Sequence, residues 1–312
     1  MGAERLGKGL YLIDTVAVGA RGTVAAYLIL GRKRALVDCG HASSLPTLLE
    51  GLREAGLRPE ELDYIIPTHV HLDHAGAAGA LARLAANALV VAHSRAKPHL
   101  VDPSKLIRSA TQLFGEQLMK AYGLPEPIEE ARVQAFDREL SVDLGGGLEL
   151  RLLYAPGHAP HQLVAYIERE RILLTADSVG ILYPDFPRAM IPTTPPPSFD
   201  PALAMRTAQE LSQLPAVKLL LPHFGPREDV AWVWSETERG IESWARVAER
   251  TLEDGKGPEA ILDRITGDFL KRAGVAEPAR LPAYVRVSLW TSAMGLYTYY
   301  TKDKSPARAG RP

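Results

Sequence analysis

The stretch His69-Val70-His71-Leu72-Asp73-His74 places three of the chain's nine histidines and one carboxylate within six residues. Such an H-x-H-x-D-H string is rare by chance, so it favours a metal site over scattered surface or core histidines. An apolar run from Tyr64 to Ile66 precedes it and predicts a buried strand, while Ala75 to Leu84 predicts a small-residue helix. The block is therefore expected in a loop at a strand end, where α/β proteins place their sites.

The spacing inside the block suggests two metal ions. His69 and His71 can converge on one ion, while Asp73 and His74 point the other way and can bind a neighbouring ion. Neutral imidazole and carboxylate ligands suit Zn, Fe or Mn. Such a site needs further ligands, and the candidates each close an apolar strand: His158, Asp177 and His223.

Short strands and helices alternate along the rest of the chain. The first strand-like runs, separated by glycine turns, predict an antiparallel start, and residues 94–130 predict a helical insertion. Beyond residue 229 the pattern becomes helical, so we expect one domain over 1–229 and a helical region over 230–312. The predicted strands are Leu10 to Val16, Ala26 to Leu30, Ala35 to Asp38, Leu89 to Ala92, Ser141 to Asp143, Leu148 to Tyr154, Leu163 to Ile167, Arg171 to Thr175 and Leu219 to Leu221. The predicted helices are Leu45 to Ala55, Leu106 to Tyr122, Ala202 to Leu214, Val230 to Leu252 and Pro258 to Ala273.

Composition narrows the classes of partner. With 36 Lys and Arg against 37 Asp and Glu, the net charge of −1 gives no strong nucleic-acid signal. The single cysteine, Cys39, cannot form an internal disulfide, and no apolar stretch is long enough for a bilayer. We therefore expect a cytoplasmic protein without a membrane partner, and the scarcity of Asn and Cys favours a thermophilic source.

The order of the candidate residues resembles that of the metallo-β-lactamase superfamily, the αββα metallohydrolases. The family motifs match Asp38, the block at 69–74, His158, Asp177 and His223 in sequence, over roughly residues 8 to 229. The resemblance implies an α+β fold, namely a four-layer αββα sandwich with a C-terminal helical extension. All seven metal ligands of the family pattern are present, which disfavours a non-catalytic binding module.

The resemblance also implies a role for each residue. His69, His71 and His158 would bind the first ion, and Asp73, His74 and His223 the second, with Asp177 bridging them. Asp38 would support the ligand loop, and His161 is a further supporting candidate, whereas His41, His93 and His99 are expected on the surface or in hydrogen-bonded packing. The cofactors would be two divalent ions, zinc being favoured and manganese or iron being alternatives. A metal-bridging hydroxide would attack the substrate, with Asp73 as the catalytic base.

Within this family the residues favour a hydrolase of small-molecule esters, thioesters or lactones, similar to the glyoxalase II-like and broad-specificity branch. Asp177 disfavours a true β-lactamase, and Gly180 stands where lactonases typically carry a tyrosine. A phosphodiesterase or nuclease, and a mononuclear iron persulfide dioxygenase-like oxidoreductase, remain as alternatives. Tyr183 and Arg188, in the Pro-rich loop after Asp177, are substrate-binding candidates. The apolar run from Val285 to Tyr300 fits either a pocket cover or a homodimer contact.

Overall fold

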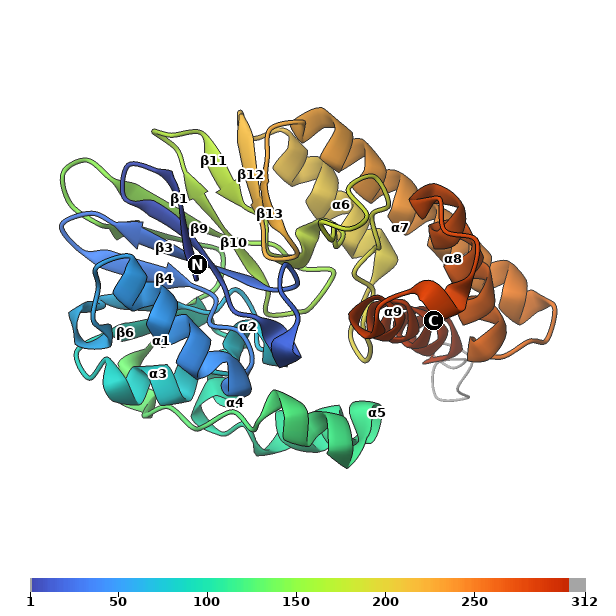
Figure 1. Ribbon diagram of the computed structural model, residues 1–312, viewed down its shortest axis with the longest axis horizontal. Coiled ribbons are helices and arrows are strands. Elements are labelled where there is room, and N and C mark those ends of the chain that lie inside the picture. The colour runs from blue at the N-terminus through green and yellow to red at the C-terminus, as the bar shows by residue number, and fades with distance from the viewer. Residues whose placement is uncertain (1, 303–312) are drawn as a thin grey trace, which may run out of the picture. The chain divides into compact units, whose positions relative to one another are not determined.

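The computed structural model describes residues 2–302 and divides into two compact units (Figure 1). Among the described residues, unit 1 is built from 2–155, His161–Ala176 and Ala216–Glu228. Unit 2 is built from Pro156–Pro160, Asp177–Pro215 and 229–302. A compact unit need not fold independently. The predicted division into domains at 1–229 and 230–312 therefore stays a prediction.

Sheet A of unit 1 has seven strands in the order in which they occur along the chain. The first four strands pair antiparallel, which confirms the predicted antiparallel start, and the last four pair parallel. Parallel neighbours need long crossovers. Two of these crossovers contain the helices α1 (Leu45–Glu54) and α3 (Ala78–Leu84). The strands are β1 (Ala3–Gly7), β2 (Leu10–Asp14), β3 (Ala25–Leu30), β4 (Arg34–Val37), β5 (Tyr64–Ile66), β6 (Leu89–His93) and β7 (Val133–Phe136).

Sheet B of unit 1 has six strands in the order β13-β12-β11-β10-β9-β8. Both β9 and β11 pair antiparallel with β10, and β12 pairs parallel with β11. The carboxyl ends of β9, β11 and β12 therefore lie at the same edge of the sheet. The strands are β8 (Glu139–Asp143), β9 (Glu149–Tyr154), β10 (Leu163–Ile167), β11 (Ile172–Leu174), β12 (Lys218–Leu221) and β13 (Gly225–Arg227).

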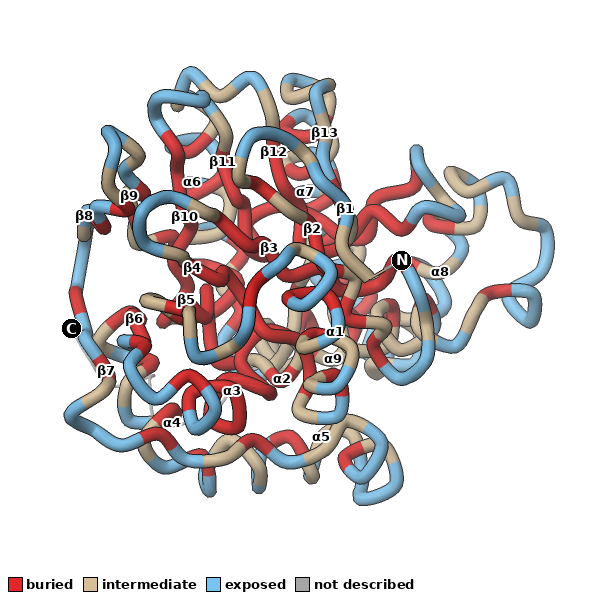
Figure 2. Tube along the Cα trace, turned by 60° about the vertical axis from the view of Figure 1, so that its left-hand side comes forward, coloured by how far each residue is buried: buried red, intermediate tan, exposed pale blue. Residues whose placement is uncertain are grey.

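Alternation along the strands of sheet A separates two apolar layers. In β2, Leu12 packs in one cluster and Ile13 in another, because successive side chains point to opposite faces of a sheet. The Leu12 cluster joins the two sheets, since it also holds Leu152 and Leu163 of sheet B. The Ile13 cluster contains residues of α1, including Leu48. Figure 2 shows most of this strand framework as buried chain.

Unit 2 is mainly helical. Its helices are α6 (Pro201–Ser212), α7 (Val230–Glu253), α8 (Pro258–Ala273) and α9 (Ala283–Lys302). Trp244 of α7, Phe269 of α8 and Leu289 of α9 are buried in one cluster, so these three helices share an apolar core. Within residues 2–302, no helix has the length and apolar character required to cross a bilayer.

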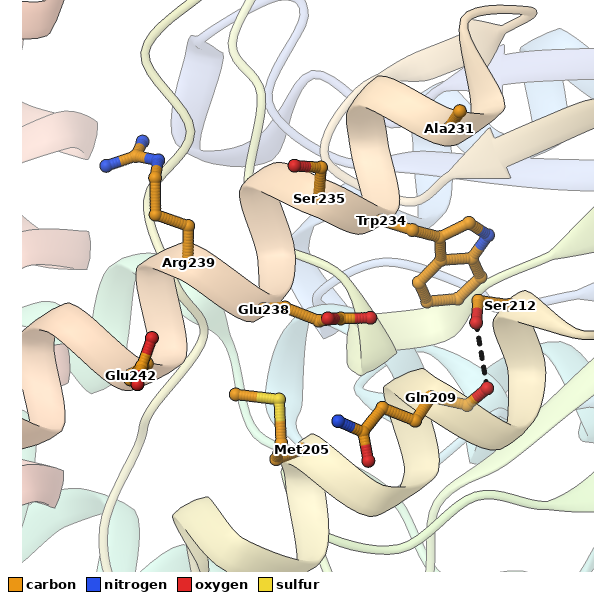
Figure 3. A pocket seen from close by; sticks show the side chains of 9 residues that line it. All are labelled: Met205, Gln209, Ser212, Ala231, Trp234, Ser235, Glu238, Arg239 and Glu242. Atoms are coloured by element: carbon orange, nitrogen blue, oxygen red, sulfur yellow. Dashed lines mark hydrogen bonds between the residues drawn. The ribbon is translucent and has the colours of Figure 1, made fainter.

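A groove of about 790 Å³ runs between α6 and α7 of unit 2 (Figure 3). Its lining is mixed, with the buried Trp234 beside charged Glu238 and Arg239. None of the nine lining residues is a predicted site residue.

Three local elements differ from the expected pattern. The helix predicted over Ala75 to Leu84 is two helices, α2 (Leu72–Ala75) and α3, and a side chain at Gly76 between them would lie 2.2 Å from the Leu72 carbonyl oxygen. The 94–130 insertion contains α4 (Lys97–Val101) and α5 (Ser104–Tyr122), of which α4 was not predicted. Gly115 interrupts α5 with a φ of 78°.

Candidate metal centre

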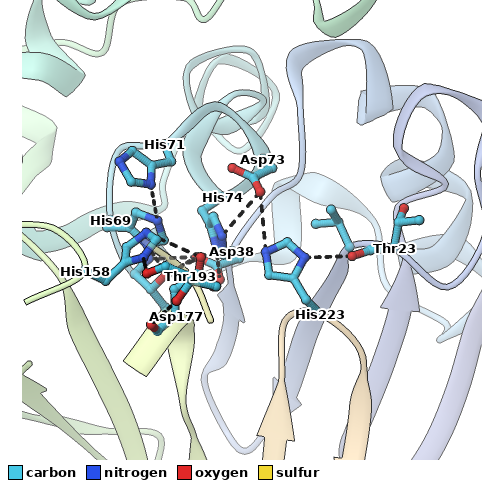
Figure 4. Close-up of polar contacts among 12 residues, drawn as sticks. Thr23, Asp38, His69, His71, Asp73, His74, His158, Asp177, Thr193 and His223 are labelled. Carbon is cyan, nitrogen blue, oxygen red and sulfur yellow. Dashed lines mark hydrogen bonds and ion pairs between the residues drawn. The ribbon is translucent and has the colours of Figure 1, made fainter. Parts of the chain in front are cut away.

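Asp38 organises the ligand loop of unit 1. It directly follows β4 and has a φ of 61°, a left-handed conformation that is costly for a residue with a side chain. Its buried carboxylate accepts hydrogen bonds of 2.8 Å from the Thr68 amide and the Thr68 hydroxyl. It also accepts one of 2.8 Å from His74 Nδ1 (Figure 4). Because a carboxylate accepts these bonds, His74 carries its proton on Nδ1 and directs Nε2 elsewhere.

His223 is held in the same way by a backbone carbonyl. Its Nδ1 donates to the carbonyl oxygen of Thr23 over 2.7 Å, and the side chain is buried. A carbonyl oxygen can only accept, so the neutral ring presents a lone pair on Nε2. That Nε2 lies 3.4 Å from Asp73 Oδ2, while His74 Nε2 lies 3.7 Å from the same oxygen (Figure 4).

The arrangement of Asp73, His74 and His223 fits a cation. Ligand atoms of all three lie within 4.8 Å of one another. Two imidazole lone pairs facing one carboxylate oxygen are unfavourable unless a proton or a metal ion lies among them. Histidines that hand one ring nitrogen to a carboxylate or carbonyl and keep the other for the ion are typical of metal sites.

The charge of this group also controls Asp73. Burial raises the pKa of the Asp73 carboxyl, but His74 and His223, when their rings carry positive charge, outweigh it and hold that pKa well below its usual range. Asp73 is therefore an anion at neutral pH, as a metal-binding carboxylate must be.

His69 and His71 form the second set in the block. His69 Nε2 and His71 Nδ1 lie 2.9 Å apart, and the Thr68 hydroxyl lies 3.1 Å from His69 Nδ1. Two ring nitrogens at this separation can bind the same ion. Thr68 therefore connects the set around His69 with Asp38, since one hydroxyl contacts both residues.

Unit 2 carries the other two predicted ligands. His158 Nδ1 donates to the Thr193 carbonyl oxygen over 3.1 Å, and His158 Nε2 lies 3.4 Å from Asp177 Oδ2. The Thr193 hydroxyl in turn donates to the Asp177 carbonyl oxygen over 2.9 Å. This pair repeats the pattern of His223 and Asp73, because the imidazole is fixed by a carbonyl and faces a carboxylate.

The remaining candidates are placed as follows. His161 is buried in unit 1 with its ring centre 6.3 Å from that of His69. Tyr183 is buried in the core of unit 2, and its hydroxyl lies 2.8 Å from the Ser288 hydroxyl. Arg188 pairs with Asp229 at 3.4 Å and stacks over Trp232. A substrate contact for Tyr183 and Arg188 stays a prediction.

Two residues beside the ligand block were missed as site candidates. His41 is buried, and among residues 2–302 its Nδ1 has no hydrogen-bond partner, so the expected hydrogen-bonded packing role is wrong for this atom. Its ring stacks on Tyr122 of α5, with centroids 4.3 Å apart. His93, by contrast, is packed and bonded as expected, since its Nε2 lies 3.0 Å from the Asp137 carbonyl oxygen. Tyr122 reaches His41 only through the fold of the insertion, so no local sequence motif predicts this contact.

The sequence and the fold both match known proteins. The metallo-beta-lactamase superfamily model matches residues 19–223, about two thirds of the chain, and the chain belongs to this superfamily. The α+β fold with C-terminal helices, predicted above, is thereby confirmed. A solved metallo-beta-lactamase family protein from Thermus thermophilus, TTHA1429, has the same fold, with a TM-score of 0.67 at 22% identity over 96% of this chain and 95% of that one.

Curated relatives differ in their described activities. The chain is 30% identical to the metallo-beta-lactamase fold-containing protein ST1585 of Sulfurisphaera tokodaii, over 61% of this chain and 68% of that protein. It is 26% identical to the flavo-diiron protein FprA2 of Clostridium acetobutylicum, over 56% of this chain and 38% of FprA2. It is 28% identical to an N-acyl homoserine lactonase of Bacillus thuringiensis, over 52% of this chain and 55% of the lactonase.

Proposed function

We propose that this protein is a binuclear metal-dependent hydrolase acting on an ester, thioester or lactone. The observation that carries the proposal is the repeated orientation of His74, His223 and His158. Each hands Nδ1 to a carboxylate or carbonyl oxygen and turns Nε2 toward an aspartate. Histidine hydrogen-bonded in this manner is arranged to bind a metal ion.

The proposed first ion is held by His69, His71 and His158, and the second by Asp73, His74 and His223, with Asp177 bridging. The sheet order supports this assignment, since the strands that precede His158, Asp177 and His223 end at the same edge of sheet B. Two divalent ions, zinc being favoured with manganese or iron as alternatives, would supply Lewis-acid activation of water and of the substrate's oxygen.

Residues of this chain orient the metal-binding histidines and remove a proton from the attacking water. Asp38 fixes the His74 ring, and the Thr23 carbonyl fixes that of His223, so the ligands are ordered before substrate arrives. The Asp73 side chain is 29% exposed, more than the buried rings around it, so a water molecule can reach it. We assign to Asp73 the uptake of the proton of the attacking water.

The proposed substrate is a small molecule with a carbonyl group. The similarity to an N-acyl homoserine lactonase supports a lactone or a related acyl compound. A phosphodiester comes next, because a pair of metal ions serves phosphoryl and acyl transfer alike. We also propose a cytoplasmic location, with which the buried thiol of Cys39 is compatible, and a homodimer as an assembly to be tested.

A second candidate is an iron-dependent oxidoreductase. The similarity to FprA2 favours it, since that relative is described as a flavo-diiron protein. An oxidoreductase with a single iron would be a persulfide dioxygenase-like enzyme. Its iron would be held by His69 or His71, by His158 and by Asp177. Metal identity separates these candidates from the hydrolase.

The proposal is tested with protein loaded separately with zinc and with manganese. The substrates are an N-acyl homoserine lactone, a p-nitrophenyl ester, an S-acyl thioester and bis(p-nitrophenyl) phosphate. We expect hydrolysis of at least one of the three acyl compounds, lost in His71→Ala and Asp177→Ala but kept in His93→Ala, which alters a histidine of sheet A outside the site. No acyl hydrolysis with either metal, or full activity in His71→Ala, would overturn it.

A further inference from the structure

Tyr122 ends α5 beside the ligand block of unit 1. It belongs to an apolar cluster with the buried Leu72, Ala110 and Met119 and the partly buried Phe114. Leu72 lies inside the block, between His71 and Asp73. The insertion therefore places an apolar surface directly against the loop that carries the predicted ligands.

The loop under Tyr122 is itself tied to the block. The Tyr122 ring stacks on His41 with centroids 4.3 Å apart and an interplanar angle of 23°. Two residues before His41, the Cys39 amide donates to the His74 carbonyl oxygen over 2.7 Å. The position of Tyr122 is therefore coupled to a predicted ligand through a short run of backbone.

Gly123 fixes the end of α5 on this loop. Its φ is 75°, and a side chain there would lie 2.9 Å from the Ser43 amide nitrogen. Only glycine combines this conformation with so close a backbone approach. The approach leaves the neighbouring Tyr122 little freedom to shift.

The hydroxyl of Tyr122 is available to a ligand. Among residues 2–302 no hydrogen bond is made by Tyr122 Oη, and the side chain is only partly buried. Burial and, to a lesser extent, the charge of Asp73 raise the pKa of Tyr122 to about 12. The hydroxyl therefore keeps its proton at neutral pH and can donate it to a hydrogen bond.

A second tyrosine of unit 1 stacks on a histidine in a similar way and serves as a comparison. Tyr154 stacks on His93 with centroids 4.2 Å apart and an angle of 21°, nearly the geometry of Tyr122 on His41. There, however, the Tyr154 hydroxyl accepts a hydrogen bond of 3.2 Å from Arg95. The two stacks differ because Tyr154 Oη has a hydrogen-bond partner in Arg95, whereas Tyr122 Oη, which lies at the ligand block, has none among residues 2–302.

We propose that Tyr122 is a substrate-positioning residue, whose hydroxyl donates to the carbonyl or carboxylate oxygen of an acyl group while the α5 cluster holds its apolar chain. The inference rests on the proposed function and narrows its substrate class to compounds with an apolar acyl chain. A hydrogen-bond donor next to an apolar wall is the arrangement expected of a small-molecule pocket.

The test measures binding rather than turnover, with hexanoate as the probe and calorimetry on metal-loaded protein. Tyr122→Phe keeps the ring and removes the hydroxyl, so we expect hexanoate to bind at least fivefold more weakly, with metal content and Tm unchanged. Tyr154→Phe is the matched control and should bind as the wild type does. Acetate should bind the wild type at least tenfold more weakly than hexanoate, because it lacks the apolar chain.

Equal hexanoate affinity in Tyr122→Phe and the wild type would overturn the inference, as would no measurable binding to the wild type. Similar affinities for acetate and hexanoate would overturn the role of the α5 cluster. The proposed function fails separately: if Tyr122 governs hexanoate binding but no ester, thioester or lactone is hydrolysed, the positioning role stands and the hydrolase does not.

Discussion

The predicted ligands of unit 1 and those of unit 2 are held in different ways. In unit 1, the Asp73, His74 and His223 group is held by the buried Asp38, which follows β4, and by the carbonyl of Thr23, which precedes β3. In unit 2, one residue, Thr193, contacts both His158 and Asp177. The buried carboxylate of Asp38 carries a charge, whereas Thr193 contacts its neighbours through a neutral carbonyl and hydroxyl, so we expect the Asp38 contact to contribute more to ligand orientation.

Removing a ligand from either unit should give the largest effect. His223→Ala in unit 1 and Asp177→Ala in unit 2 should each reduce hydrolysis to the uncatalysed background, because the proposed mechanism uses both ions. Circular dichroism should show that both variants remain folded. Undiminished activity in either variant would break the comparison, since that unit would then not contribute to the site.

Acid should lower the free energy of unfolding of the protein through protonation of His41. Burial lowers the pKa of His41 to about 4, against about 6.5 in an unfolded chain. Between these values the unfolded state binds the extra proton, so stability present above pH 6.5 is lost as the pH falls toward 4. The loss amounts to about 3 kcal/mol.

Urea unfolding of the metal-free protein at pH 7 and pH 4.5 measures this loss. His41→Gln, which does not titrate, should show a smaller decrease than the wild type over the same interval. Parallel decreases in the two proteins would show that His41 is not the residue responsible.

Loss of the hydrogen bonds that Asp38 makes to His74 and Thr68 should have the next largest effect. Asp38→Asn removes the charge that accepts the His74 Nδ1 proton and two Thr68 bonds. Loss of such a supporting partner typically lowers metal affinity about 10- to 100-fold. Competition with a chromophoric chelator measures the affinity, with Asp137→Asn, an aspartate bonded to Ser94 outside the group, as the control. An unchanged affinity would contradict the assigned role of Asp38.

The brace of unit 2 should matter least. Thr193→Val removes the hydroxyl that donates to the Asp177 carbonyl, but it leaves the backbone carbonyl that accepts from His158. One such hydrogen bond is worth about 1 kcal/mol, so metal affinity should fall less than about tenfold. A loss as large as that of Asp38→Asn would mean that the two units brace their ligands equally.

The sequence predicts the secondary structure correctly where the apolar pattern is clear. The run from Tyr64 to Ile66 is β5, and the helix predicted over Pro258 to Ala273 is α8. It missed β7, in which only Val133 and Phe136 are buried, and β13, whose Gly225-Pro226-Arg227 has no apolar signal. These strands form because a neighbouring strand offers an edge, which no local pattern records.

The candidate site shows the same limit. Candidate residues that form a recognisable motif, such as the block at 69–74, were found from the sequence alone. The pairing of His41 with Tyr122 depends on how α5 packs on a loop some eighty residues earlier. The bond from His158 to Thr193 ends on a backbone carbonyl oxygen, which a residue of any type would supply. Contacts made by distant packing or by backbone atoms leave no signature in residue type.

The number and identity of metal ions per chain test the central claim most directly. Protein purified without added metal or chelator is analysed by elemental mass spectrometry against protein concentration. We predict about two zinc or manganese ions per chain, falling in His223→Ala and unchanged in His93→Ala. About one iron would favour the dioxygenase-like candidate instead, and no metal, with no uptake on soaking, would contradict the binuclear site.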